Sequence, residues 1–303
     1  MATALHTPPT AQATPAVVGR PRRAAQYLAR GALLALAVLL LGITAQLVLV
    51  SPLQQRAAQH AGFDSLRASL AEGTAPVAQT DDNGRLLALG TPLLLLDITE
   101  LKVHQVVFEG TDSAVLTKGP GHRRDTPLPG QAGTSVIMGR AAAYGAPFGQ
   151  LSDLEPGDTF TVTTGQGRFS YRVLDLRRAG DRAPGAPAAG KGRLVLESAT
   201  GYQYLPEGVL RVDADLVSPT ADTPAAVIAP GAIAASEQPL GSSDADLWVL
   251  VLWLQGLVLA SVAAVWAWHR WGRHQTWIVF VPLVAVLGLQ VADQVTLLLP
   301  NLL

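Results

Sequence analysis

The chain has 303 residues, a formal net charge of −1 and no cysteine. This small charge gives no indication of a nucleic-acid or strongly acidic partner. The absence of cysteine excludes disulfides, thiolate metal sites and a thiol nucleophile. Hydrophobic residues make up 49% of the chain and gather at its two ends, which favours membrane spans around one globular part over two ordinary soluble domains.

The N-terminal part predicts a tail followed by a membrane anchor. Residues 1–30 are rich in Ala, Pro and Thr and then in Arg, and we expect a disordered, basic, cytoplasmic tail. Residues 31–50 carry no charge, and their length matches a hydrocarbon core of roughly 30 Å. A cleaved signal peptide is the competing interpretation, but the apolar stretch is longer than an ordinary h-region and no clean A-x-A site follows it.

The middle of the chain predicts a stalk and then a β-structure. Residues 51–90 are interpreted as a stalk or linker, helical at first and with a turn at residues 81–84. Over residues 91–217 short apolar runs alternate with turn residues, which predicts a mostly antiparallel barrel or sandwich. Residues 142–154 are expected to form a short helix. The seven strand candidates are PLLLLDI, KVHQVVFEG, SVIMG, DTFTVTT, FSYRVLDL, RLVLESA and VLRVDADLV, with turns that include GPGH and GAPFG.

The last part of the chain predicts a return to the membrane. Residues 218–246 are rich in Pro, Ala and Ser and are interpreted as a linker. Residues 247–268 and 277–300 are two further candidate transmembrane helices, joined by a loop that contains Arg270 and Arg273. Because these arginines and those before the first span mark the cytoplasmic side, the middle of the chain is expected outside.

One acidic residue lies inside the last candidate span. Asp293 is close to the end of that span, where a carboxylate reaches the membrane interface at low cost. The alternative interpretation is a hydrogen bond between helices, with Gln255 or Gln290 as the partner.

Three stretches of the predicted barrel carry motifs in a specific order. They are EGTDSAVLTKGPGHRRDTPLPGQAG at 109–133, SVIMGRAAAYGAPFGQLSDLEPGDTFTVTT at 135–164 and RLVLESATG at 193–201. The order and spacing of GPGH, LPG, YGAPF, LxPGD and a final LVL strand resemble the sortases, and most of all the class E enzymes of actinobacteria. Sortases are membrane-anchored cysteine transpeptidases of Gram-positive bacteria. The resemblance implies an eight-stranded β-barrel outside the membrane, here accompanied by three transmembrane α-helices.

The resemblance also implies three catalytic positions, a Cys, a His and an Arg, that act on the Thr-Gly bond of a Leu-Pro-x-Thr-Gly-like sorting signal. In relatives the His follows a strand like VIAGH, where VIMGR places Arg140. The Cys ends a strand like LTLVTC, where LVLESA places Ala199. The candidate for the third position is Arg211, although the register of its strand against the family is not fixed by the sequence. The alternative interpretation is an outward-facing strand residue near Asp213 or Asp215. Two of the three positions therefore lack the family's chemistry.

A serine mechanism is an alternative, because Ser198 directly precedes Ala199. A serine hydroxyl needs an adjacent base, and Arg140 stays protonated. His122 and Glu197 are the other candidates for a base, but strand alternation sends Glu197 and Ser198 to opposite faces.

We assign His122, Tyr144 and Glu197 to the substrate groove. Arg140 is interpreted either as a solvated or salt-bridged residue, with Glu197 as the partner, or as a fork that binds a carbonyl or carboxylate in the groove. No cofactor is expected. No metal site is expected either, because the histidines of the barrel have no neighbouring ligand cluster.

These observations predict a multi-pass protein of the cell membrane with an extracytoplasmic, catalytically inactive sortase-like domain. The predicted function is binding of a sorting-signal peptide, a surface protein or a cell-wall component. One alternative is an active, cysteine-free transpeptidase or hydrolase that uses Ser198, and another is a structural subunit of a membrane complex. The expected partners are the membrane and a peptide, without nucleic acid, and the sequence does not set the oligomeric state.

Overall fold

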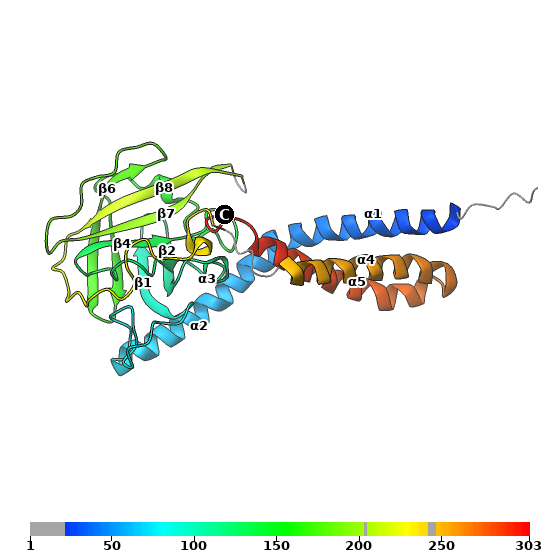
Figure 1. Cartoon of the computed structure of the whole chain (residues 1–303), viewed down its shortest axis with the longest axis horizontal. Helices are drawn as coiled ribbons and strands as arrows, with labels where there is room; N and C mark the ends of the chain where they lie inside the picture. The colour runs from blue at the N-terminus through cyan, green and yellow to red at the C-terminus, as the bar shows by residue number, and fades with distance from the viewer. Residues whose placement is uncertain (1–21, 203–204, 242–246) are drawn as a thin grey trace, which may run out of the picture.

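A computed structural model of the chain describes residues 22–202, 205–241 and 247–303. In these residues a β-barrel stands at one end of a bundle of three long helices (Figure 1). Most of the tail expected at residues 1–30 lies outside the described residues, since the first of them is residue 22. The expectation of disorder is wrong for residues 22–30, which are helical.

Eight strands close the barrel in the order β1-β2-β3-β4-β7-β8-β6-β5, which confirms the predicted fold class. The pairs β2–β3 and β4–β7 are parallel, whereas the other neighbouring strands are antiparallel. The strands are β1 Pro92–Ile98, β2 Val103–Glu109, β3 Gly121–His122, β4 Gly133–Met138, β5 Thr159–Thr164, β6 Gly167–Arg177, β7 Gly192–Tyr202 and β8 Leu205–Leu216.

Alternating apolar residues fill the interior of the barrel. In β5 Phe160 and Val162 are buried while the threonines beside them are partly or fully exposed, as a strand with one buried face requires. β6 repeats this pattern with Phe169, Tyr171 and Val173. Tyr171 stacks on Phe160 at 5.6 Å between ring centroids, and its buried hydroxyl accepts a hydrogen bond from the backbone N–H of Gly130 at 2.6 Å.

Two local expectations about the barrel are wrong. GPGH is not only a turn, because Gly121–His122 form β3, a strand too short to show any periodicity. Residues 142–154 do not form an α-helix and contain only the 3-10 turn η2, Leu151–Asp153. Tyr144 and Ala146 have φ angles of 51° and 46°, in the left-handed region that an α-helix excludes.

Among the described residues, three helices are long and apolar enough to cross a membrane. The first, α1 (Arg22–Ala45), continues through the π-helical turn η1 (Gln46–Val50) into α2 (Ser51–Glu72), and the other two are α4 (Leu247–Arg270) and α5 (Arg273–Leu297). α1 and α5 approach closely at Gly42, where an added Cβ would lie 2.9 Å from the carbonyl oxygen of Gly288. Small residues permit such close packing of helices in membranes.

Asp293 has a hydrogen-bond partner other than those expected. Its carboxylate accepts from Nε2 of Gln46 at 3.0 Å, and the same Nε2 lies 3.1 Å from Oε1 of Gln54. Neither Gln255 nor Gln290 makes this bond. The contact ties α5 to the π-helical turn where α1 passes into α2, so Asp293 contributes to the junction between the bundle and the barrel.

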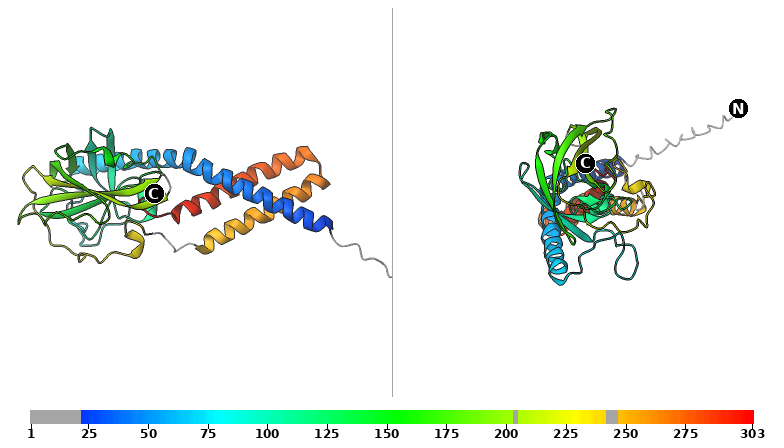
Figure 2. Two further views of the ribbon diagram at one scale, coloured as in Figure 1. Left: turned by 90° about the horizontal axis from the view of Figure 1, so that it is seen from above. Right: turned by 90° about the vertical axis from the view of Figure 1, so that its left-hand side faces the viewer.

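Segments outside the sheet cover the barrel. α2 packs Leu66 against Val106 and Phe108 of β2, and Figure 2 shows it running along one side of the barrel. The segment between β8 and α4 also lies on the barrel. Its backbone N–H groups at Val227 and Ile228 donate to Oε1 of Gln79 at 2.7 and 3.0 Å. The described part of the expected linker is therefore docked on the barrel.

Candidate functional site

Strand pairing brings Arg140 and Ala199 to the same end of the barrel. β4 pairs with β7 in parallel, with Met138 opposite Glu197, and the next N–H, of Gly139, donates to the carbonyl of Glu197 at 3.0 Å. Arg140 lies just past the end of β4, and Ala199 lies beyond this bond in the neighbouring strand β7. A side chain at Gly139 would overlap the ring of Phe148, so glycine is required where the chain turns into the site.

Arg140 is a buried cation held by backbone oxygens. Its side chain is fully buried, Nη1 donates to the oxygen of Leu303 at 2.9 Å, and Nη2 donates to the carbonyl of Ser113 at 3.3 Å. Its Nε finds no hydrogen-bond partner among the described residues. Burial lowers the pKa of Arg140 to about 10, so the guanidinium is still charged at neutral pH. Both acceptors are main-chain oxygens, and Glu197, the partner expected for a salt-bridged Arg140, is not among them.

Glu197 pairs with Arg211 and not with Arg140. Nε of Arg211 donates to Oε1 of Glu197 at 2.7 Å across the β7–β8 pair. The Glu197 carboxylate is buried, and its second oxygen has no partner in the described part of the chain. The expected neighbours of Arg211 have other partners, since Asp213 binds Arg177 and Asp215 binds Arg193. Arg211 therefore neutralises a buried carboxylate beside the site.

Ser198 is buried, and its hydroxyl has two carbonyl acceptors nearby. Its Oγ lies 3.2 Å from the backbone oxygens of both Gly139 and Phe148, and the residue is 1% exposed. A serine nucleophile needs a base that takes its proton. The two carbonyl oxygens accept a hydrogen bond from the hydroxyl, but neither can act as a base. This geometry holds the β4 end against the loop that contains Phe148.

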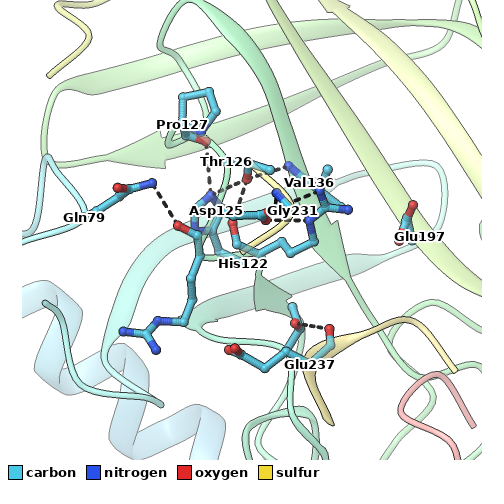
Figure 3. A network of polar contacts seen from close by, with 12 residues as sticks. Gln79, His122, Asp125, Thr126, Pro127, Val136, Glu197, Gly231 and Glu237 are labelled. Atoms are coloured by element: carbon cyan, nitrogen blue, oxygen red, sulfur yellow. Dashed lines mark hydrogen bonds and ion pairs between the residues drawn. The ribbon is translucent and has the colours of Figure 1, made fainter. Parts of the chain in front are cut away.

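His122 belongs to a buried network (Figure 3). It is fully buried, with Nδ1 3.1 Å from Oε2 of Glu109 and Nε2 3.1 Å from the carbonyl of Pro127. Oγ1 of Thr126 lies 3.2 Å from the same Nε2 and accepts a bond from the N–H of Val136. These contacts join β2, β3 and β4 and use both ring nitrogens, so the geometry assigns His122 to the packing of the barrel.

Tyr144 connects the barrel to the helices. Its hydroxyl lies 2.9 Å from Oγ1 of Thr296 in α5, and its N–H donates to Oγ of Ser51 in α2 at 3.3 Å. Its ring also lies 5.1 Å from the guanidinium carbon of Arg140. The loop after β4 thus contacts the site and both helices that reach the barrel.

A cavity of about 560 Å³ opens beside Ala199. It combines apolar walls with an exposed cation, Arg178, and an acid, Glu207, a composition that suits an extended peptide better than a purely apolar ligand. The lining residues are Ala141, Ala142, Phe148, Gly149, Ser152, Arg178, Ala199, Thr200, Gly201, Tyr202, Glu207, Leu210 and Leu303. Of the seven site residues expected from sequence, Ala199 lines this cavity and the other six do not.

Sequence reasoning missed the residues that follow α5. Asn301 and Leu302 are fully buried against the barrel, and Leu303 is 3% exposed. The signal in the sequence is LLPNLL, where a proline and a polar asparagine interrupt an apolar run, since proline ends a helix and a buried asparagine needs partners.

No group of three or more metal-binding side chains occurs within the described residues. The acidic turn SDLEPGD has a local role, because the Asp158 carboxylate accepts the N–H of Glu155 at 2.8 Å. This bond closes the turn between η2 and β5 within the segment itself.

Comparison with known proteins gives one family model and several relatives. Residues 96–207 match the model of the sortase domain. Sortase D of Bacillus subtilis (strain 168) is 30% identical over 83 residues, which are 27% of this chain and 40% of that protein. The matched segment thus spans less than half the length of this curated relative.

Solved sortase structures are also similar. Sortase E from Streptomyces avermitilis is 26% identical, with a TM-score of 0.37, and the match covers 44% of this chain and 91% of that one. The sortase D5 transpeptidase of Clostridium perfringens is 19% identical, with a TM-score of 0.43 and coverage of 54% and 99%.

Proposed function

We propose that the sortase domain of this chain is a membrane-anchored binding module without catalytic activity, whose groove takes an extended peptide such as a sorting signal. The observation that carries the proposal is the pair Arg140 and Ala199, a buried cation and a methyl group at the two positions that correspond to the family's His and Cys. The chain has no cysteine anywhere that could replace the missing thiol. The motif set supports a place near the class E sortases.

The site offers groups that suit a peptide backbone. Arg140 directs its guanidinium at backbone oxygens, and the N–H of Ala141 also donates to one, the carbonyl of Leu302 at 2.8 Å. Beside these donors lie the methyl of Ala199 and the cavity of about 560 Å³. Fixed N–H donors next to an apolar wall recognise an extended chain by its main chain and one side-chain face.

The two alternative functions have less support. A serine mechanism requires a base at Ser198, whose hydroxyl instead faces the carbonyl oxygens of Gly139 and Phe148. A purely structural role is favoured by the contact between Tyr144 and Thr296, but it gives no reason for the cavity beside Ala199.

We further propose that the barrel is extracytoplasmic. Figure 2 shows the beginning of α1 and the turn between α4 and α5 at the end of the bundle away from the barrel. Arg30 is exposed near that end of α1, and Arg270 and Arg273 are exposed in the turn. By the positive-inside rule this end faces the cytoplasm.

Peptide binding by the full chain in nanodiscs tests the function. A fluorescein-labelled Leu-Pro-x-Thr-Gly-type peptide is titrated by anisotropy, with Leu-Ala-x-Thr-Gly-type peptides in parallel. Ala142→Trp fills the cavity, and Ala189→Trp places the same bulk on an exposed loop as a control. We expect binding to the unaltered chain and to Ala189→Trp, with at least a tenfold loss in Ala142→Trp. Equal affinities for all three proteins would refute a peptide site in this groove.

A further inference from the structure

The residues after α5 lie in the site as a peptide would. Figure 1 shows that the chain leaves α5 and returns to the barrel. Residues 299–303 then pass Arg140, and the oxygens of Leu302 and Leu303 take hydrogen bonds from the N–H of Ala141 and from Nη1 of Arg140 at 2.8 and 2.9 Å. These are the donors that any extended ligand would use there.

Leu302 fills an apolar recess at the position of the missing thiol. It is fully buried, and Ala199 packs against the same cluster. The other members of that cluster are Leu116, Val136, Met138, Val195 and Val209. A leucine side chain therefore occupies the apolar cluster against which Ala199 packs, while Ala199 and Leu303 both form part of the wall of the cavity that is left open.

Asn301 holds the segment in place. Its Nδ2 donates to the carbonyls of Ser236 and Gln238 at 2.5 and 2.8 Å, and its Oδ1 accepts from Oγ of Ser113 at 2.9 Å. Its backbone N–H donates to Gly241 at 2.9 Å. A buried amide whose donors and acceptor are all used specifies one position, so the segment is seated by a defined anchor and not by apolar contact alone.

We propose that residues 299–303 are a tethered peptide ligand of the groove, which an incoming peptide must displace. This inference rests on the proposed binding function. The partner that fits is an extended peptide that offers a backbone carbonyl to Arg140 and an aliphatic side chain to the recess filled by Leu302. A tethered ligand is present at a high effective concentration and occupies the groove for much of the time. The apparent affinity for a free peptide falls in proportion to the fraction of time that the groove is empty.

A single thiol in this cysteine-free chain reports the position of the segment. Leu302→Cys in nanodiscs is labelled with a maleimide, and Leu240→Cys, at a position that is 48% exposed, is the accessible reference. We expect Leu302→Cys to react at least about tenfold more slowly. Asn301→Ala removes three side-chain hydrogen bonds and should raise the labelling rate of Leu302→Cys about tenfold. The matched change Asn83→Ala, at an exposed position, should leave this rate unchanged.

Peptide affinity is the second readout in the same proteins. Asn301→Ala should bind the fluorescein-labelled Leu-Pro-x-Thr-Gly-type peptide about tenfold more tightly than the unaltered chain or Asn83→Ala. Labelling of Leu302→Cys as fast as Leu240→Cys would overturn the seating of the segment. Faster labelling in Asn301→Ala with unchanged affinity would overturn the competition. If no peptide bound either form although labelling responded, the proposed function itself would be wrong, and the competition would be refuted with it.

Discussion

Arg211 is expected to stabilise the barrel through Glu197, and Arg211→Met tests this. The substitution leaves a carboxylate that is 4% exposed and whose second oxygen already lacks a partner within the described residues. Two unit charges about 4 Å apart attract by about 4 kcal/mol at an effective dielectric constant of about 20. Because the Arg211 side chain is 30% exposed, solvent screening reduces this to about 2–3 kcal/mol, slightly below the cost of breaking a fully buried pair.

Hydrogen exchange of β7 and β8 in the intact chain measures this effect, because protection in these strands reports the free energy of opening. A loss of about 2–3 kcal/mol corresponds to exchange about 30- to 150-fold faster. The double variant Glu197→Gln with Arg211→Met removes the stranded charge and should recover most of the loss. If the double variant were as destabilised as Arg211→Met alone, the two side chains would not be coupled and the assigned role of Arg211 would be wrong.

Three further changes test the neighbouring contacts. Tyr144→Phe should weaken docking of α5 by about 1 kcal/mol, seen as faster exchange near Thr296 in an otherwise normal chain, but not in a Thr296→Val background. Burial raises the pKa of Glu237 above its ordinary value of 4.5. The folded state therefore binds the carboxyl proton more tightly than the unfolded state, and stability falls as pH rises through the raised pKa. Glu237→Gln should remove that fall in thermal melts. Ser198 should stay unlabelled by a fluorophosphonate probe, and labelling that is lost in Ser198→Ala would contradict its assignment.

The barrel could be predicted because its strands carry their signal locally. PLLLLDI, DTFTVTT and FSYRVLDL are apolar or alternating runs bounded by turn residues, and all three became strands. β3 carried no such signal, since two residues show no period. The expected helix at residues 142–154 failed because the backbone turns there into the left-handed region at Tyr144, where its side chain reaches α5. That conformation depends on a partner about 150 positions away.

Motif order points to Arg140 and Ala199 as the positions of interest, but their surroundings could not be predicted. Glu197 adjoins Ser198 in sequence, and only strand pairing shows that its carboxylate faces Arg211. His122 has the residue type of a catalytic base, and only its burial shows that both ring nitrogens are already used. The proline and asparagine of LLPNLL signal an interruption after α5, but the partners of Asn301, at residues 113, 236, 238 and 241, are far from it in sequence and no local pattern names them.

Disulfide trapping tests most directly whether the groove binds a sorting-type peptide. Ala199→Cys gives this chain a single thiol inside the groove, and Ala189→Cys gives it one on an exposed loop. Each protein in nanodiscs is mixed with a Leu-Pro-x-Cys-Gly peptide whose cysteine is activated as a thionitrobenzoate, and intact mass follows the adduct.

Exposure alone would favour the loop, because Ala199 is partly buried and Ala189 is exposed. Specific binding predicts the reverse order, with Ala199→Cys trapped at least about tenfold faster than Ala189→Cys, because a bound peptide holds its disulfide at a high effective concentration next to the thiol. This advantage should be lost when Ala142→Trp is added. Trapping of Ala189→Cys at an equal or higher rate would contradict the account.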